Sequence, residues 1–453
     1  MTRLDRRRLL GGAAGAAIGG LLPAACAPTA PRGGPPPNVL VVLADDLGWG
    51  DLSCYGAADG RTPALDGLAA EGVRLVNAYA ASCVCTPTRA ALLTGRYPQR
   101  LGPGLQRPIV FRWTGDAHER LPGLSPTQPT LASLLRGRGY RTALVGKWHL
   151  GYLPRFSPIK SGFDEFFGIT SGGVDYFTHR DGGGHLDLYE NDVPVERTGY
   201  LTDLLAERAV GVLERASRQR AAFYLSLHFT APHWPWMGPA DGDRAGLTDL
   251  RDRGGGSPAV YREMVRALDA GVGRVLGALE RLGLARDTLV IFTSENGGGR
   301  FAQHGPLAGR KEDLLEGGIR VPALLRWPGT IPPGVVSRQV AVTMDWPATV
   351  LAATGTAPDP RHPLDGEDVL PELRGARPPR PRTLHWRHRR AEPPRIQEAM
   401  LEGRLKYLAQ DERARLFDLE HDPGEQTDLA GARPADVARM QARHDAWFAE
   451  MTR

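Results

Sequence analysis

Four runs of the sequence are almost continuously apolar, and each is followed at once by polar residues. They lie at residues 38–44, 141–146, 223–229 and 288–292. Runs of this length without alternation are typical of strands that are buried on both faces, as in a parallel sheet covered by helices. The chain is therefore expected to adopt an α/β fold with a mainly parallel sheet.

Two longer segments repeat apolar residues at the helical period, at residues 202–216 and 259–281. They are predicted to be amphipathic helices that connect the strands and cover the sheet. In open sheets of this kind, ligands bind beyond the carboxyl ends of the strands. The polar residues after the four runs are thus candidates for one shared site: Asp45, Asp46, Lys147, His149, His233, Glu295 and Asn296. Polar residues at one strand end are common, but this mixture at four ends is not expected by chance.

A cysteine precedes a predicted short helix between the first two strands. Residues 87–93 begin with a proline and are followed closely by Gly95, a pattern typical of the start and end of a helix. Cys85 would then lie at the helix N-terminus, where the helix dipole favours negative charge. Arg89, one turn later, could hold an anion there. The alternative is that Cys85 is a buried structural cysteine.

Lysine and cysteine are rare in this chain of 453 residues, although its composition is that of an ordinary soluble globular protein. The lysines are Lys147, Lys160, Lys311 and Lys406, and the cysteines are Cys26, Cys54, Cys83 and Cys85. Four cysteines at these spacings exclude a disulfide framework and a Cys-rich zinc module. The position of each lysine and cysteine is therefore informative.

Residues 1–25 resemble a twin-arginine-type signal peptide, with basic residues before an apolar Gly/Ala run. Cys26 follows a lipobox-like sequence and is a candidate for lipidation; alternatively it is an ordinary cysteine beside a cleavage site. Residues 26–37 are rich in Pro and Gly and suit a tether. Loss of residues 1–25 would lower the formal charge from +5 to +2, so basicity does not argue for a nucleic-acid partner. We expect export to the periplasm or cell surface, with lipid attachment at Cys26.

The segment Cys85-x-Pro87-x-Arg89, followed by Thr94-Gly95, resembles the signature of the formylglycine-dependent (type I) sulfatases. The resemblance extends over nearly the whole mature chain, which is similar to the arylsulfatases and N-acetylgalactosamine-sulfatases. The other matching segments are Asp45-Asp46-Leu47-Gly48, Lys147 to Gly151, Gly162 to Gly168, Pro232-His233, Lys311 with 316–322, and 417–425.

This resemblance implies an alkaline-phosphatase-like α/β/α sandwich and a smaller C-terminal α+β subdomain with an antiparallel sheet. We place the catalytic domain at residues 38–375 and the C-terminal subdomain at residues 376–453. The junction falls in residues 357–382, which are rich in Gly, Pro, Asp and Arg.

The resemblance also implies the catalytic roles. A formylglycine-generating enzyme would oxidise Cys85 to Cα-formylglycine before the twin-arginine machinery exports the chain. The hydrated aldehyde would attack sulfur, and Arg89 would hold it. Lys147 and Lys311 would bind the sulfate, His233 would protonate the leaving oxygen, and His149 would take a proton from formylglycine. The alternatives are surface lysines and histidines that only satisfy core hydrogen bonds, as expected for His228 inside its strand.

Asp45, Asp46, Glu295 and Asn296 form an oxygen-only ligand set, which suits Ca²⁺ or Mg²⁺ rather than zinc. The resemblance implies Ca²⁺, with an oxygen of formylglycine at Cys85 as a further ligand. Glu295 departs from the family, which commonly has Asp there, and its longer side chain shifts the reach of the carboxylate. Cys83 is also unusual so close to the nucleophile. Cys54 and Cys83 could form a disulfide or remain thiols.

Residues 171–199 resemble loops on the substrate side of related sulfatases. Asp175, Tyr176, His179 and Arg180 are candidate contacts to a sugar or carboxylate, and the alternative is that they are ordinary loop residues. The expected substrate is a sulfated carbohydrate or an aryl sulfate. A phosphodiester or phosphonate monoester hydrolase on the same scaffold is the second hypothesis. A non-catalytic sulfated-glycan binder ranks below both, because it predicts gaps in a set of residues that is complete.

Overall fold

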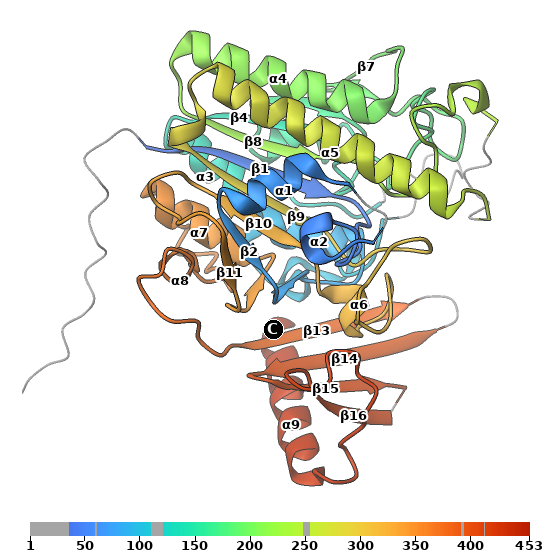
Figure 1. Ribbon diagram of the computed structural model, residues 1–453, viewed down its shortest axis with the longest axis vertical. Coiled ribbons are helices and arrows are strands. Elements are labelled where there is room, and N and C mark those ends of the chain that lie inside the picture. The colour runs from blue at the N-terminus through green and yellow to red at the C-terminus, as the bar shows by residue number, and fades with distance from the viewer. Residues whose placement is uncertain (1–35, 59–60, 110–120, 248–253, 391–393, 412) are drawn as a thin grey trace, which may run out of the picture. The chain divides into compact units, whose positions relative to one another are not determined.

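The four apolar runs form four neighbouring parallel strands at the centre of a ten-stranded sheet (Figure 1). They are β1 (Asn38–Ala44), β4 (Arg141–Gly146), β8 (Phe223–His228) and β9 (Thr288–Ser294), in the spatial order β9-β1-β8-β4. β1 pairs in parallel with both β8 and β9, and β8 pairs in parallel with β4. All four carboxyl ends therefore meet at one edge, as predicted.

The computed structural model describes residues 36–58, 61–109, 121–247, 254–390, 394–411 and 413–453. Residues 36–453 form a compact unit. The predicted signal peptide, Cys26 and most of the predicted tether lie outside the described residues. Among the described residues, no helix combines the length and hydropathy needed to span a membrane.

The flanks of the sheet are mixed in direction. β10 (Ala323–Arg326) runs antiparallel to β9, and β5 (Glu165–Gly168) runs parallel to β4. The complete order is β11-β2-β10-β9-β1-β8-β4-β5-β6-β7. The remaining strands are β2 (Val73–Leu75), β11 (Val335–Ser337), β6 (Tyr189–Glu190) and β7 (Val193–Pro194). Beside this sheet, β3 (Ala78–Tyr79) pairs with β12 (Ala341–Val342).

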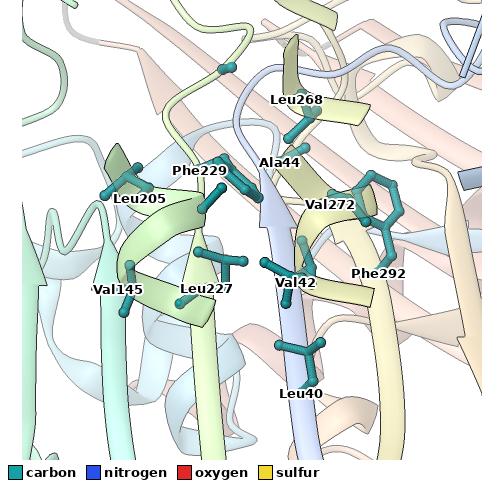
Figure 2. Close-up of a cluster of buried hydrophobic side chains, with 14 of the residues drawn as sticks. Leu40, Val42, Ala44, Val145, Leu205, Leu227, Phe229, Leu268, Val272 and Phe292 are labelled. Carbon is teal, nitrogen blue, oxygen red and sulfur yellow. The ribbon is translucent and has the colours of Figure 1, made fainter. Parts of the chain in front are cut away.

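Helices cover both faces, and the side chains of β1 alternate between them. Leu40, Val42 and Ala44 pack under α4 (Leu201–Gln219) and α5 (Pro258–Arg281), where Leu205, Leu268 and Val272 meet them (Figure 2). Val39, Val41 and Leu43 join the core on the opposite face. That core also takes residues from α2 (Cys85–Thr94), α3 (Leu131–Gly137), α7 (Asp345–Thr354) and α8 (Leu370–Leu373). α1 (Pro63–Ala70) packs beside α5. Burial on both faces explains why these runs do not alternate.

A second sheet follows near the C-terminus. β13 (Thr383–Arg390), β14 (Arg395–Glu402), β15 (Leu405–Gln410) and β16 (Arg413–Asp418) form an antiparallel meander. α9 (Pro434–Met451) packs on it through Met440 and Trp447. This confirms the predicted α+β character of the region. Leu384 and Trp386 of β13 share a buried cluster with Cys83 and Val84, so this sheet is packed against the segment that precedes α2.

Candidate active site

The predicted polar residues converge beyond the carboxyl ends of the central strands. Hydrogen bonds between neighbouring backbones continue past the strand ends and fix the positions of these residues. The N–H of Glu295 donates to Ala44 O (3.1 Å), and the N–H of Lys147 donates to His228 O (2.9 Å). Asp45 is fixed in the same way by Ala231 O (3.2 Å). The strands therefore aim these side chains at one point.

Two cations and two carboxylates form a fully buried cluster at this point. Nζ of Lys147 lies 2.5 Å from Oδ2 of Asp45 and 3.8 Å from Oε1 of Glu295. The guanidinium of Arg89 on α2 pairs with Oε2 of Glu295 and lies 3.4 Å from Asp45. Arg89 also donates to Lys147 O (2.7 Å), so it joins α2 to the end of β4.

Asp46 turns in the opposite direction and meets a different set of residues. Its backbone has φ +63°, and a hydrogen bond from the Tyr261 hydroxyl to its carbonyl (3.3 Å) supports this conformation. Nζ of Lys311 lies 2.7 Å from Oδ1 of Asp46, and Nδ2 of Asn296 lies 2.8 Å from the same atom. Nε2 of His233 lies 3.7 Å from its Oδ2. Asp45 and Asp46, although adjacent in the sequence, thus pair with two different ammonium groups, those of Lys147 and Lys311.

Burial and ion pairing oppose each other in this cluster. Burial raises the pKa of Asp45, and the nearby Glu295 carboxylate adds to that rise. Burial disfavours the charged form of Glu295 as well, but Arg89 and Lys147 outweigh it and lower the pKa. For Lys147, burial is outweighed by Asp45, Cys85 and Glu295, so its pKa is raised. Lys147 and Glu295 are therefore held in their charged forms.

Cys85 is the first residue of α2, so the helix begins two residues earlier than the sequence suggested. Val84 before it is extended, Pro87 occupies the third helical position, and Gly95 closes the helix at φ +68°. Proline is tolerated there because the N–H groups of a first turn have no intrahelical acceptor. Cys85 carries a free, buried thiol whose pKa is raised to about 12 by burial, while Lys147 and Lys311 act to lower it. The thiol therefore remains protonated.

His149 is buried and His233 is partly buried, and both lie near the cluster. Burial lowers the pKa of both His149 and His233 well below the usual range. His149 has φ +52°, and its Nε2 lies 3.0 Å from Ile109 O. One ring nitrogen of His233 lies within 4.8 Å of Cys85 Sγ and a carboxylate oxygen of Asp45. His228, by contrast, is bonded to Ser226 Oγ (2.8 Å) and Lys147 O (3.2 Å) and is a satisfied core histidine, as expected.

The oxygen atoms of the site fit a hard divalent cation. Carboxylate oxygens of Asp45, Asp46 and Glu295 lie within 4.8 Å of one another. Oδ1 of Asp45, Oε1 of Glu295 and Oδ1 of Asn296 are buried and have no hydrogen-bond donor among the described residues, whereas Oε2 of Glu295 is paired with Arg89. Buried oxygens without donors are costly unless a cation or ordered water satisfies them. Their chemistry matches Ca²⁺ or Mg²⁺.

The substrate-loop candidates are mostly engaged in holding their own loop. Asp175 accepts backbone N–H groups from Phe177 (2.9 Å), Thr178 (2.8 Å) and Gly246 (3.0 Å). The Tyr176 hydroxyl donates to Thr230 O (2.8 Å) and His233 O (3.0 Å). These bonds favour a structural role for both residues, and Tyr176 thereby supports the segment that carries His233.

The other two candidates differ in exposure. His179 is buried, and burial lowers its pKa. Arg180 is about half exposed, with its guanidinium 3.0 Å from Gly184 O and 3.5 Å from Glu196. Of the four candidates, Arg180 alone presents a side chain to solvent, so it is the one that could reach a ligand without rearrangement of the loop.

Two features of the site were not foreseen. Lys406 is fully buried and pairs with Glu316 (2.9 Å) and Glu425 (2.8 Å), although the sequence offered no role for it beyond the rarity of lysine. Gln397 on β14 is bonded to the segment that carries Lys311. The described cysteines Cys54, Cys83 and Cys85 are all free thiols, which decides the disulfide question for this structure.

Comparisons with known proteins agree with this geometry. The model of the sulfatase family matches residues 37–356. N-acetylgalactosamine-6-sulfatase of Sus scrofa is 36% identical over 363 residues, with 75% of this chain and 66% of the relative covered. Arylsulfatase A of Homo sapiens is 37% identical over 368 residues, with 75% and 68% covered. The chain thus spans about two thirds of the length of the curated relatives it matches.

Among solved structures, Ps i-CgsB in complex with k-i-k-neocarrahexaose is 30% identical, with a TM-score of 0.81 and coverage of 91% of this chain and 93% of that one. A parallel sheet between helices, with this cluster beyond its strand ends, is the alkaline-phosphatase-like fold. Within that class, the chain belongs to the sulfatase family.

Proposed function

We propose that this protein hydrolyses sulfate esters, with a sulfated carbohydrate as the principal substrate class. One observation carries the proposal: Cys85, Asp45 and His233 offer ligand atoms within 4.8 Å of one another, and the charges of Lys147 and Lys311 both act on Cys85. Conversion of Cys85 to formylglycine would place an aldehyde, and its hydrate, at the centre of this group. Cys85 itself is a protonated thiol and a poor nucleophile, so the oxidised side chain suits the chemistry better.

Asp45, Asp46, Glu295 and Asn296 would hold Ca²⁺, or Mg²⁺, through their side-chain oxygens, of which Oδ1 of Asp45, Oε1 of Glu295 and Oδ1 of Asn296 lack a hydrogen-bond donor among the described residues. When bound, the cation would act as a Lewis acid that favours ionisation of the hydrate. The side chains balance in charge without it, because Lys147, Lys311 and Arg89 each pair with one of the three carboxylates. A divalent cation would make the site positive, which suits an anionic sulfate ester.

Lys147 and Lys311 would then stabilise the sulfate oxygens as charge develops on them. One hydroxyl of the hydrate gives its proton to solvent and its oxygen attacks sulfur, and the bond from sulfur to the substrate oxygen breaks. His233, which takes up a proton once the anionic sulfate ester lies beside it, gives that proton to the leaving oxygen, and the alcohol departs. Sulfate now remains bonded to the formylglycine carbon.

The second step restores the aldehyde. His149 accepts the proton of the remaining hydroxyl, the carbon–oxygen bond to sulfate breaks, and inorganic sulfate leaves with the bonding electron pair. Water then rehydrates the aldehyde. Arg89 holds Glu295 and the first turn of α2 in place throughout, because its guanidinium bonds both Glu295 and the carbonyl of Lys147.

We further propose that export of the folded chain depends on residues 1–25, and that Cys26 provides lipid attachment. The domain division at residues 375/376 is likewise a proposal; the antiparallel sheet begins at Thr383, inside the predicted C-terminal part.

The test begins with mass spectrometry of protein made in a host that contains a formylglycine-generating enzyme. Cleavage at Arg74 and Arg89 yields peptide 75–89, which contains Cys83 and Cys85, and fragment ions should place an aldehyde at Cys85 alone. Turnover is then compared for 4-nitrophenyl sulfate, the phosphate monoester, a phosphodiester and sulfated oligosaccharides, with and without a Ca²⁺ chelator.

We expect sulfate-ester hydrolysis that Cys85→Ala abolishes and that Cys54→Ala, the matched control, leaves unchanged. Activity of a protein with an unmodified Cys85 would overturn the mechanism. A strong preference for the phosphodiester would favour the second hypothesis.

A further inference from the structure

The C-terminal sheet contacts residues 311–316, the segment that begins with Lys311, near both ends of that segment. At one end, Gln397 of β14 reaches the residues that follow Lys311. At the other, Lys406 of β15 pairs with Glu316, the first residue of α6 (Glu316–Ile319). All three of these side chains are buried. We propose that Gln397 is a positioning residue that sets the conformation of Lys311, so that the C-terminal sheet completes the active site. This rests on the proposed function.

Both polar atoms of the Gln397 side-chain amide form a hydrogen bond with the backbone of this segment. Oε1 accepts the N–H of Leu314 (3.0 Å), and Nε2 donates to the carbonyl of Glu312 (2.8 Å). The side chain amide therefore uses its acceptor and one donor on the backbone of one short loop, and only one orientation of the amide satisfies both partners. Gln397 is 3% exposed, so water cannot easily replace these bonds.

The loop needs such support because its backbone is strained. Glu312, directly after Lys311, has φ +74°, a conformation that is costly for a residue with a Cβ. The N–H of Glu312 donates to Cys83 O (3.0 Å), and the N–H of Lys311 donates to Gly298 O (2.9 Å). Gln397 adds the bond to the Glu312 carbonyl. The loop is thus tied to the segment before Cys85, to the segment after Asn296 and to β14.

We expect these contacts to set the direction of the Lys311 ammonium group. Nζ of Lys311 lies 2.7 Å from Asp46, and the proposed reaction requires it beside the sulfate. Without Gln397, the buried Leu314 N–H would lose its acceptor and the Glu312 carbonyl would lose this hydrogen bond, and relaxation of Glu312 toward negative φ would turn the Lys311 side chain away. Small displacements of a charged group cost large factors in rate. Gln397 acts on the reaction through Lys311 and touches no reacting atom.

The experiment compares Gln397→Met, which keeps the length of the side chain and removes both hydrogen bonds, with Gln410→Met. Gln410 lies opposite Gln397 on the neighbouring strand and is half-buried, so it is a matched control. We expect Gln397→Met to lose about tenfold or more in kcat/KM on 4-nitrophenyl sulfate. Formylglycine content measured by mass spectrometry should be unchanged, and Gln410→Met should resemble wild type.

The decisive measurement is a double-mutant cycle with Lys311→Ala. If Gln397 acts through Lys311, then Gln397→Met will cost nothing further in the Lys311→Ala background. Equal losses in both backgrounds would overturn the proposal, because they would show a general structural effect. Should Gln397→Met fail to fold, Gln397→Glu retains an acceptor for the Leu314 N–H and takes its place in the cycle.

Hydrogen exchange separates this proposal from the proposed function. Amides of residues 311–319 should exchange faster in Gln397→Met than in Gln410→Met, whatever reaction the enzyme catalyses. Unchanged exchange in that segment would overturn the positioning role even in an active sulfatase. Absence of sulfatase activity in wild type, together with faster exchange in the variant, would instead refute the proposed function alone.

Discussion

Nζ of Lys147 lies 2.5 Å from Oδ2 of Asp45, and neither side chain is exposed to solvent. The pair joins the ends of β4 and β1, two strands that are separated by β8 in the sheet. Each partner compensates a charge that could not be buried alone. The same ammonium group is therefore a structural partner of Asp45 and, in the proposed reaction, a group that binds sulfate.

Lys147→Met should remove both the ion pair with Asp45 and the positive charge that binds sulfate. Because Asp45 would lose a buried ion pair, we expect the metal-free protein to lose about 3–5 kcal/mol in its free energy of unfolding. We expect kcat to fall by about 100-fold or more, because one stabilising charge on the sulfate is lost. Denaturant unfolding and turnover measure the two effects. Lys160→Met is the control, since the Lys160 ammonium is exposed and donates to a nearby carbonyl, Pro154 O (2.6 Å). A loss in that variant of similar size would contradict the assignment.

Removal of the metal should lower both stability and activity. Calcium at about 1,000 times its Kd should stabilise the folded protein by about 4 kcal/mol relative to the chelated form. Glu295→Gln removes one charged ligand and the ion pair with Arg89, so Ca²⁺ affinity should fall at least about tenfold. Titration calorimetry and thermal unfolding with Ca²⁺ or EDTA test this. The exposed Glu280→Gln is the comparison. Wild-type affinity in Glu295→Gln would exclude Glu295 as a ligand.

Substitution of glycine by alanine is expected to have opposite effects at two positions, Gly172 and Gly277. A Cβ at Gly172 would lie 3.0 Å from Cε1 and 3.1 Å from Nε2 of His149, so Gly172→Ala should displace the imidazole and lower kcat by about tenfold to 100-fold. Gly277 on α5 has no atom within 4 Å of such a Cβ. Gly277→Ala should therefore stabilise the protein by about 0.5–1 kcal/mol without loss of activity. Steady-state kinetics and thermal unfolding of both variants check the contrast, and equal activities would refute the contact with His149.

Acid should destabilise the packing of α9 through His385. Its ring is stacked on Trp447, 4.8 Å between centroids, and burial, with a smaller effect of His444, lowers its pKa to about 3. The unfolded chain would bind a proton below pH 6.5, but the folded chain would not until about pH 3, so stability is lost as pH falls through this window. Arg443 also faces this imidazole and disfavours its protonation.

His385→Phe should keep the ring stacking and remove the titration. Between about pH 6.5 and pH 4, we expect the variant to lose about 2–3 kcal/mol less of its free energy of unfolding than wild type does. Urea unfolding across this range measures the difference. The exposed His421→Phe should retain the wild-type slope. An unchanged slope in His385→Phe would show that another group governs acid stability.

Much of the site could be predicted because its residues come soon after strands in the sequence, and those strands can be recognised from their runs of apolar residues. Asp45 and Lys147 each come first after an apolar run, and Glu295 follows the fourth run after Thr293 and Ser294. Parallel strands bring such residues to one edge whatever the connections between them. Cys85 and Arg89 are one turn apart on a helix whose ends are marked by Val84 and Gly95. The predicted helix nonetheless began too late, because Pro87 suits any position in a first turn.

The sequence by itself determined the four central strands, the oxygen-rich residues that follow them and the position of the cysteine, since these depend on periodicity and short spacing. Only the tertiary structure decided which cation meets which carboxylate: Lys147 with Asp45, Lys311 with Asp46. It alone showed that Asp175 is bonded within its own loop and that Gln397, 83 residues beyond Leu314, supports the loop of Lys311. Such contacts depend on how one sheet packs against another, and no local pattern of residues records that packing.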